Sequence, residues 1–307
     1  MPRPLKVGIQ LPEVEREVRW PELREMTQLA ERIGLDSIWI GDHLLYRDDG
    51  RPTRGPWEMW STLAALAAVT ERVEIGPLVA STSFHAPAML AKKAVTIDEI
   101  SRGRLILGLG AGWNEPDYRA FGFPYDHRVS RFEEAFTIIR TLLSTGRCDF
   151  HGTYYDVDDC ELLPRGPRPA GPPLLIGSTG ERMLSLTLPH VAAWNAWFTE
   201  FGNGLDGYRA LRDRIDAACR AVSRPPEVVE RTVALFVRFA DLDPGPSPIR
   251  RTPDEPAIDG DPAEVAGVLR AFAGEGVGHV QLVLDPITIE SIAALAPALA
   301  ILDRADG

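Results

Sequence analysis

Short apolar runs alternate with longer segments of helical spacing along most of the chain. Runs such as Ser37–Ile40 and Leu105–Gly110 are apolar at consecutive positions, as in strands that are buried on both faces. Between such runs, apolar residues recur every three or four positions, which is typical of helices that pack on a sheet. This alternation predicts β-α units around a parallel sheet.

Eight such units are counted in the sequence. Without a Gly/Ser-rich linker between them, they favour an α/β fold of the (β/α)8 TIM-barrel type, as one domain over residues 1–307, rather than an open doubly wound sheet. The predicted strands are Val7–Leu11, Ser37–Ile40, Val73–Ala80, Leu105–Gly110, Leu174–Gly177, Ala192–Ala196, Val228–Phe239 and His279–Leu284. The predicted helices are Trp20–Ile33, Trp57–Thr70, Pro87–Ser101, Arg131–Ser144, Glu181–Leu188, Tyr208–Val222, Pro262–Ala273 and Ile289–Leu302.

Two segments near 147–173 and 241–260 fall outside the repeat and are predicted to be insertions. Long loops of this kind are either lids over the barrel mouth or inert surface segments.

The composition limits the classes of partner. The chain has 307 residues, 45% of them hydrophobic, and a net charge of −11 without a basic run, so we expect neither nucleic acid nor a membrane as a partner. The three cysteines lack C-x-x-C spacing, which predicts free thiols and no metal site. The start shows no targeting segment, and the longest apolar stretch, 63–69, is too short to span a bilayer. We therefore expect a soluble, cytoplasmic protein.

The chemistry of such a barrel lies at the carboxyl ends of the strands. Asp42 and His43 follow the second predicted strand. A histidine there can act as a general acid or base near neutral pH, with Asp42 biasing its charge or tautomer. The alternative is a rim histidine that only hydrogen-bonds the backbone.

Two glycine-containing turns are candidate ligand sites. The run GLGAGW (108–113) lets the backbone approach a flat ligand and offers Trp113 as a stacking face, although tight strand packing also explains its glycines. The turn GSTG (177–180) leads into a predicted helix, whose first N–H groups suit a phosphate. An ordinary helix cap by Ser178 or Thr179 is the alternative, and both can hold at once.

Aromatic side chains near the strand ends suggest a substrate pocket of apolar or aromatic character. They are Trp57, Trp60, Phe84, His85, Trp113, Trp197 and Phe198.

The segments GLDSIWIGDH (34–43), RGRLILGLGAGWNEPDYRAFG (102–122) and PLLIGSTGERMLSLTLPHVAAWN (173–195), with Arg128 and Glu134 between them, resemble the bacterial luciferase-like family. Within it they look most like the oxidoreductases that depend on the deazaflavin coenzyme F420. The resemblance covers most of the chain up to about residue 200.

The resemblance implies a barrel that carries a flavin-type ring across its mouth and transfers a hydride. It implies that His43 is the acid/base or ring-contacting residue, and that a cis peptide bond joins Leu78 and Val79 behind the ring. The cofactor-binding residues that it implies are Asp42, His43, Leu78, Val79, Ala80, Ser81, Ala111, Gly112, Trp113, Gly177, Ser178, Thr179 and Gly180.

Departures from the family pattern bear on the substrate. Trp113 stands where the sugar-phosphate dehydrogenases of the family have a catalytic Glu, and Arg47 stands where they have a Trp. We therefore do not expect a sugar phosphate. Glu115 is a second candidate catalytic acid, with a solvated carboxylate as the alternative.

The resemblance implies hydride transfer between coenzyme F420 and a small apolar or aromatic substrate. Two alternatives stay open: an FMN-dependent monooxygenase that uses reduced flavin and O₂, and a non-catalytic barrel that binds flavin or deazaflavin. The family also implies a homodimer.

Overall fold

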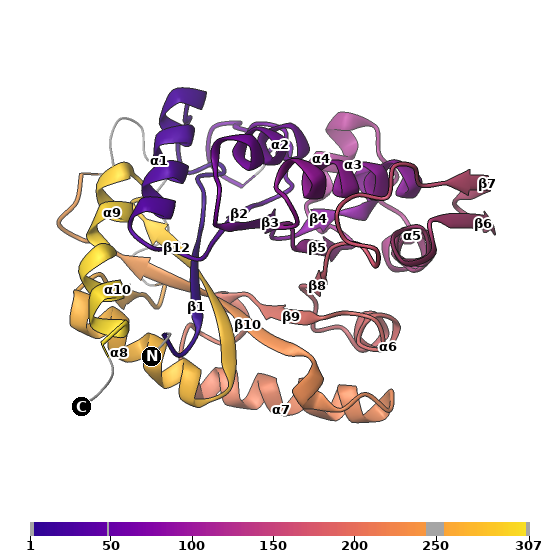
Figure 1. The fold of residues 1–307 in the computed structure, drawn as a ribbon. Coiled ribbons are helices and arrows are strands. Elements are labelled where there is room, and N and C mark those ends of the chain that lie inside the picture. The colour runs from indigo at the N-terminus through magenta and orange to yellow at the C-terminus, as the bar shows by residue number, and fades with distance from the viewer. Residues whose placement is uncertain (1–2, 48, 244–254, 305–307) are drawn as a thin grey trace. The chain divides into compact units, whose positions relative to one another are not determined.

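The computed structural model describes residues 3–47, 49–243 and 255–304. The chain divides into two compact units. Unit 1 comprises Met1–Trp39, Arg72–Glu74 and Gly177–Gly307, and unit 2 comprises Ile40–Glu71 and Ile75–Ile176. Each unit contains parallel strands that alternate with helices along the chain (Figure 1), which confirms the predicted α/β class. The single-domain organisation stays a prediction.

The strands of unit 1 are parallel and follow the order β2-β1-β12-β10-β9, with β11 beside β10. Nearly every position of β10 and β12 is buried, as the apolar runs in the sequence predict. The bounds are β1 (Lys6–Gln10), β2 (Ser37–Ile40), β9 (Ala193–Ala196), β10 (Glu230–Arg238), β11 (Ile258–Asp259) and β12 (Val277–Asp285).

The helices of unit 1 pack in pairs, with α1 beside α9, α6 beside α7 and α8 beside α10. α8 begins where the Asp261 side chain accepts the backbone N–H groups of Ala263 and Glu264, with Pro262 in the first turn. The bounds are α1 (Trp20–Arg32), α6 (Glu181–Thr187), α7 (Leu205–Ala221), α8 (Pro262–Gly274), α9 (Ile289–Ala294) and α10 (Ala296–Leu302), with short 3₁₀ turns η2 (Phe198–Glu200) and η3 (Pro226–Val228).

The predicted closing helix Ile289–Leu302 is interrupted at Leu295, between α9 and α10. Pro297 lies in the first turn of α10, where its missing N–H removes one hydrogen bond of a continuous helix.

Unit 2 has parallel strands in the order β8-β5-β4. The predicted third strand is divided in two, β3 and β4, which lie on either side of Leu78 and Val79. The bounds of the strands are β3 (Glu74–Pro77), β4 (Ala80–Ser81), β5 (Leu107–Gly110) and β8 (Leu174–Ile176). The helices are α2 (Met59–Val69), η1 (Thr82–Phe84), α3 (Pro87–Ile100), α4 (Glu115–Phe121) and α5 (Arg128–Thr145).

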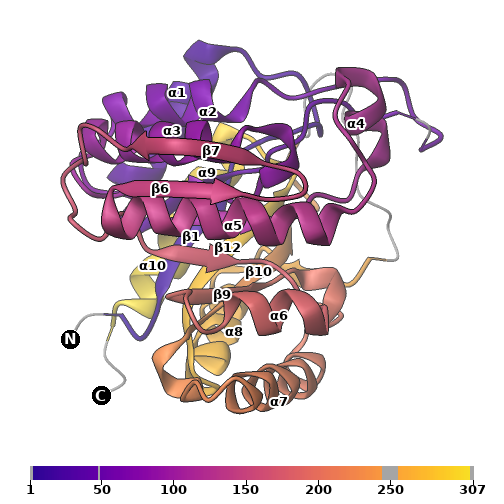
Figure 2. The same cartoon turned by 90° about the vertical axis from the view of Figure 1, so that its right-hand side faces the viewer.

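The segment 147–173, predicted as an insertion, contains an antiparallel hairpin of β6 (Arg147–His151) and β7 (Asp156–Glu161). Figure 2 shows this β6–β7 hairpin running along α5. Of the other predicted insertion, residues 244–254 lie outside the described residues.

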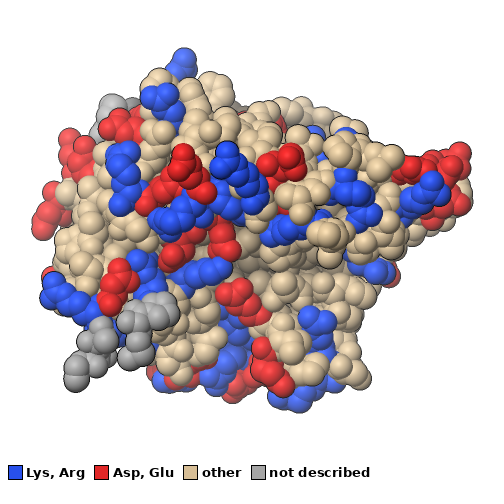
Figure 3. Space-filling model, in the orientation of Figure 1, with Lys and Arg blue, Asp and Glu red and all other residues tan. Residues whose placement is uncertain are grey.

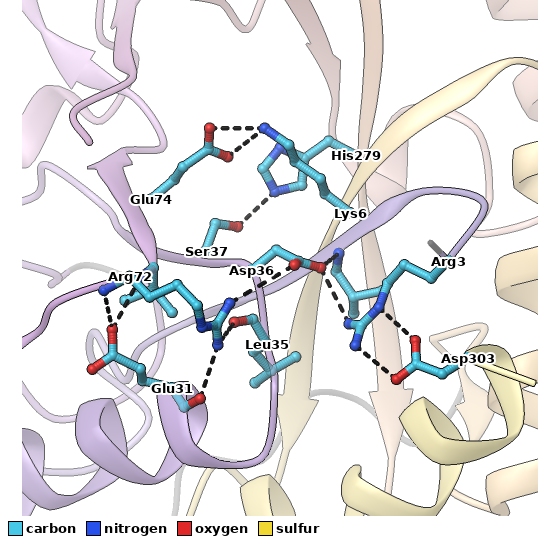
Figure 4. Close-up of polar contacts among 12 residues, drawn as sticks. Arg3, Lys6, Glu31, Leu35, Asp36, Ser37, Arg72, Glu74, His279 and Asp303 are labelled. Atoms are coloured by element: carbon cyan, nitrogen blue, oxygen red, sulfur yellow. Dashed lines mark hydrogen bonds and ion pairs between the residues drawn. The ribbon is translucent and has the colours of Figure 1, made fainter. Parts of the chain in front are cut away.

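Ion pairs join the amino ends of the unit 1 strands to both ends of the described chain (Figure 4). Arg3 bonds Asp303 at 2.8 and 3.0 Å and Asp36 at 3.1 Å, and Lys6 bonds Glu74 at 2.7 Å. Because these pairs are partly exposed, each contributes on the order of 1 kcal/mol or less.

His279 on β12 is buried beside this network (Figure 4). The Trp39 indole N–H donates to Ser37 Oγ at 2.7 Å, and Ser37 Oγ lies 2.6 Å from His279 Nε2. All three groups are satisfied when the Ser37 hydroxyl donates to Nε2 and the imidazole is neutral. Burial, with a smaller effect of Lys6, lowers the pKa of His279 to about 3.

This pKa predicts a pH dependence of stability. The unfolded chain takes up a proton on His279 near pH 6.5, and the folded chain does not. The contribution of the neutral His279 to the free energy of unfolding is therefore complete above pH 6.5 and is lost as the pH falls toward 3. His279→Gln keeps an acceptor for Ser37 but does not titrate. In urea unfolding from pH 6.5 to 4, we expect the wild-type free energy of unfolding to fall more steeply than the variant's, by up to about 1.4 kcal/mol per pH unit. Parallel profiles would contradict the assignment, and His127→Asn, at an exposed histidine, is the control.

Candidate functional site

His43 follows β2 and is held by a buried carboxylate. Its Nδ1 lies 2.8 Å from Asp117 Oδ2, and the Asp117 side chain is fully buried. Asp117 also accepts the backbone N–H groups of Leu44 at 3.1 Å and Leu45 at 2.6 Å. The Nδ1–H of His43 therefore points at Asp117, which makes Nε2 the nitrogen that can give or take a proton.

The Asp117 carboxylate is stable as an anion. Burial acts to raise its pKa, but hydrogen bonds from His43, Asn114 and the Leu45 backbone outweigh it, so the pKa of Asp117 lies below its usual value. The Asp117 carboxylate is therefore an acceptor for the His43 Nδ1–H.

The Asp42 carboxylate binds partners on a later segment, and the expectation that it biases the charge or tautomer of His43 stays a prediction. The buried Asp42 carboxylate accepts the Ser81 backbone N–H at 2.8 Å and lies 3.4 Å from His85 Nε2, which accepts the Trp60 indole N–H at 3.0 Å.

The segment Leu78–Ser81 contains the cis peptide bond that the resemblance places there, between Leu78 and Val79. The Leu78 N–H donates to the Ile40 carbonyl at 2.8 Å, and Ser81 pairs with Gly110 in the sheet. Together with the bond from Ser81 to Asp42, these contacts fix the segment against the strands on both sides of it.

The glycine run 108–113 packs against the segment 77–81. A Cβ at Gly108 would lie 2.2 Å from the Pro77 carbonyl oxygen, which supports tight strand packing as the reason for that glycine. Gly112 has φ +74°, and a Cβ there would lie 2.0 Å from the Tyr118 hydroxyl and 2.4 Å from Ser81 Oγ. The Tyr118 hydroxyl donates to the Ala111 carbonyl at 2.8 Å, so this backbone is locked to α4.

Trp113 is 64% exposed, and its ring lies edge-on to the His43 ring, with 5.3 Å between centroids. Arg128 at the start of α5 donates to the Gly112 carbonyl at 2.7 Å, and the Tyr125 hydroxyl donates to the Trp113 carbonyl at 3.2 Å. Unit 2 thus brings together Asp42, His43, Leu78–Ser81 and Ala111–Trp113, and it presents an aromatic face beside the candidate proton donor.

Glu115 is the exposed first residue of α4. The buried acid of this segment is Asp117, which the sequence analysis did not single out. The available signal was Asn114 followed three residues later by Asp117, a pairing that resembles a helix-start pattern and would have predicted α4.

The turn Gly177–Gly180 belongs to unit 1. Gly180 is the N-cap residue of α6 and has no side chain to cap it, and the Ser178 hydroxyl accepts the Gly180 N–H at 3.4 Å. The Trp194 indole N–H donates to the Ser178 carbonyl at 2.8 Å. Burial raises the pKa of Glu200, although hydrogen bonds from the Trp197 N–H and the Thr179 hydroxyl act to lower it. First-turn N–H groups without a side-chain cap fit the predicted phosphate site.

The aromatic residues predicted to line a substrate pocket differ in burial. Trp60, Phe84 and Phe198 are buried in the core, whereas Trp57 and Trp113 are 52% and 64% exposed. Trp113 is therefore the member that offers the largest accessible face beside His43.

Among the described residues, no helix has both the length and the apolar character that crossing a membrane requires.

Sequence comparison identifies the family of this chain. The family model for luciferase-like monooxygenases matches residues 6–243. The chain therefore belongs to the luciferase-like family, as its motifs predict.

Two curated relatives illustrate the range of activities in the family. The chain is 31% identical over 229 residues to the F420-dependent glucose-6-phosphate dehydrogenase of Amycolatopsis mediterranei, covering 71% of this chain and 65% of that protein. It is 29% identical over 227 residues to the pyrimidine monooxygenase RutA of Caulobacter segnis, covering 71% and 61%. The matches thus span less than two thirds of the length of these relatives.

A solved structure shows the same fold. The coenzyme F420 dependent tetrahydromethanopterin reductase from Methanopyrus kandleri matches with a TM-score of 0.77 at 17% identity, covering 98% of this chain and 99% of that chain. Together with the family model, this match confirms the predicted luciferase-like barrel of parallel strands with helices between them.

The Gly112 contacts predict that this position tolerates no side chain. Gly112→Ala adds an unfavourable positive φ, costing about 1–2 kcal/mol, to a clash with Tyr118 and Ser81 costing about 1–3 kcal/mol more. Gly122→Ala is the matched control, because Gly122 has φ +78° with open space around it. Urea unfolding should show a clearly larger decrease in the free energy of unfolding for Gly112→Ala than for Gly122→Ala. Equal decreases would contradict the packing described.

Proposed function

We propose that this protein is an oxidoreductase that transfers a hydride between coenzyme F420 and a small apolar or aromatic substrate. The observation that carries the proposal is the His43–Asp117 pair beside the exposed Trp113. Similarity to an F420-dependent dehydrogenase over 71% of the chain supports the choice of coenzyme.

The residues present fit a flat, anionic coenzyme. Trp113 offers an exposed aromatic face next to His43, and α6 begins without a side-chain cap. We assign ring contacts to Leu78–Ser81 and Ala111–Trp113 of unit 2. Phosphate binding at Gly177–Gly180 of unit 1 stays a separate prediction. When bound, the coenzyme supplies a carbon that gives or accepts a hydride.

His43 supplies the proton in this proposal. Asp117 keeps the Nδ1–H in place, so that Nε2 protonates or deprotonates the substrate oxygen. Glu115 is exposed at the start of α4 and is the second candidate for an acid role. Trp113, which replaces a carboxylate found in the sugar-phosphate branch, adds apolar surface and favours an apolar or aromatic substrate.

A second candidate function is an FMN-dependent monooxygenase. The similarity to a pyrimidine monooxygenase over 71% of the chain favours it. A third candidate is a non-catalytic barrel that binds flavin or deazaflavin, in which the same contacts hold the ring without turnover.

Coenzyme titration separates these candidates. We expect the purified protein to bind coenzyme F420 more tightly than FMN, with quenching of tryptophan fluorescence. Part of the quenching should be lost in Trp113→Phe, because that ring lies beside His43, and should persist in Trp20→Phe, at a partly exposed tryptophan of unit 1. Tighter binding of FMN would favour the monooxygenase, and binding of neither would contradict a flavin-type cofactor.

Substitution of His43 tests its role in proton transfer. His43→Asn keeps an N–H donor for Asp117 but has no atom equivalent to Nε2, so kcat should fall by about 10²–10⁴-fold while coenzyme binding changes little. The exposed-site variant His127→Asn should retain the wild-type rate. Unchanged turnover in His43→Asn would remove the catalytic assignment, and a wild-type protein that binds coenzyme but turns over no substrate would favour the non-catalytic candidate.

A further inference from the structure

Two cysteines face each other across the β6–β7 hairpin. Cys148 on β6 and Cys160 on β7 are direct partners in the antiparallel ladder. Both are free thiols in the structure, as is Cys219, in agreement with the sequence analysis. We propose that Cys148 and Cys160 form a reversible disulfide on exposure to a small-molecule disulfide, which makes the hairpin an oxidation site of this protein.

The ladder places the two residues at a distance that a disulfide can bridge. The Leu162 N–H donates to the Gly146 carbonyl at 2.8 Å, so the Cys148–Cys160 pair, two rungs further, is of the hydrogen-bonded type. The Cα atoms of such pairs are about 5.5 Å apart, within the range of about 4.4–6.8 Å found for disulfides. Opposed side chains of a ladder leave the same face of the hairpin, so the two thiols lie on one face of it.

The hairpin is held in this register by contacts outside the cysteines. The Glu134 carboxylate on α5 accepts the backbone N–H groups of Thr153, Tyr154 and Tyr155 at 2.8, 2.9 and 3.0 Å. At the open end, Arg147 pairs with Glu161. Because these contacts already order both strands, forming the cross-link requires little further ordering of the chain.

The two thiols differ in accessibility, which sets the order of the reaction. Cys148 is buried and Cys160 is half-buried. Burial, with smaller effects of Cys160 and Asp149, raises the pKa of Cys148. The Cys160 thiolate is therefore the first nucleophile, and Cys148 reacts second.

Each step balances in atoms and electrons. The Cys160 thiolate attacks a small disulfide RSSR, forming Cys160–S–S–R and releasing RS⁻. Cys148 then loses its proton to solvent and attacks Cys160 Sγ, which releases the second RS⁻. The two cysteines lose two electrons and two protons in total, and RSSR is reduced to two RSH.

The charge of the hairpin selects among oxidants. Acidic side chains gather over the hairpin in Figure 3, and Asp149, Asp156, Asp158, Asp159 and Glu161 are exposed. A cationic disulfide is attracted to this surface and an anionic one is repelled.

The experiment uses the full chain, reduced and then incubated with cystamine, which is cationic. We expect intact-mass analysis to show the loss of two hydrogen atoms, peptide mapping to join Cys148 to Cys160, and a mild thiol reductant to reverse the change. Cys219→Ser, at a buried thiol of unit 1, should behave like wild type. Cys148→Ser should stop at a mixed disulfide on Cys160, and Cys160→Ser should remain largely unmodified.

Oxidised glutathione, which is anionic, should react about tenfold more slowly than cystamine, with a smaller difference at high salt. Three results would overturn the proposal: three thiols retained after cystamine, a wild-type product that stops at the mixed disulfide, or a cross-link that joins two chains. None of these outcomes depends on which coenzyme the protein binds.

Discussion

The candidate site depends on a single buried carboxylate. Asp117 holds the His43 ring and the backbone of Leu44 and Leu45, so one side chain sets the ring orientation, its tautomer and the path of the loop after β2. A carboxylate that is buried without such donors costs several kcal/mol. The loop and α4 therefore stabilise each other, and the same helix carries Tyr118, which fixes the backbone at Ala111. Ring, loop and glycine run are parts of one hydrogen-bonded assembly.

The features that follow from local pattern could be predicted from the sequence. Buried strands are short apolar runs, and the glycine run and His43 come directly after such runs, so their placement at strand ends needed no knowledge of distant contacts. Asp117 could not be found in this way, because it lies 74 residues from His43 and two of its partners are backbone N–H groups without a sequence signature. The β6–β7 hairpin was missed because the segment 147–173 was interpreted as an insertion outside the β-α repeat, although β6 alternates polar and apolar residues.

Two histidines show how their surroundings decide the chemistry of one residue type. His279 is buried beside the neutral hydroxyl of Ser37 and near Lys6, and both burial and that cation disfavour its charged form. His43 is partly accessible, and its Nδ1 faces the Asp117 carboxylate, whose pKa lies below its usual value. The first histidine is restricted to a structural role at neutral pH, whereas the second is the candidate for proton exchange with a ligand. Their positions at opposite ends of their strands follow the usual division of such barrels into a stabilising and a reactive face.

The packing around Gly112 also constrains how this protein can diverge. The Tyr118 hydroxyl and Ser81 Oγ occupy the space that a Cβ at position 112 would need. A homologous chain that carries a side chain at position 112 must shorten or move both neighbours, at 81 and 118, and a shortened residue 118 loses the hydrogen bond that ties α4 to Ala111. Positions 81, 112 and 118 therefore form a group in which substitutions are coupled, and an alignment of relatives should show them changing together.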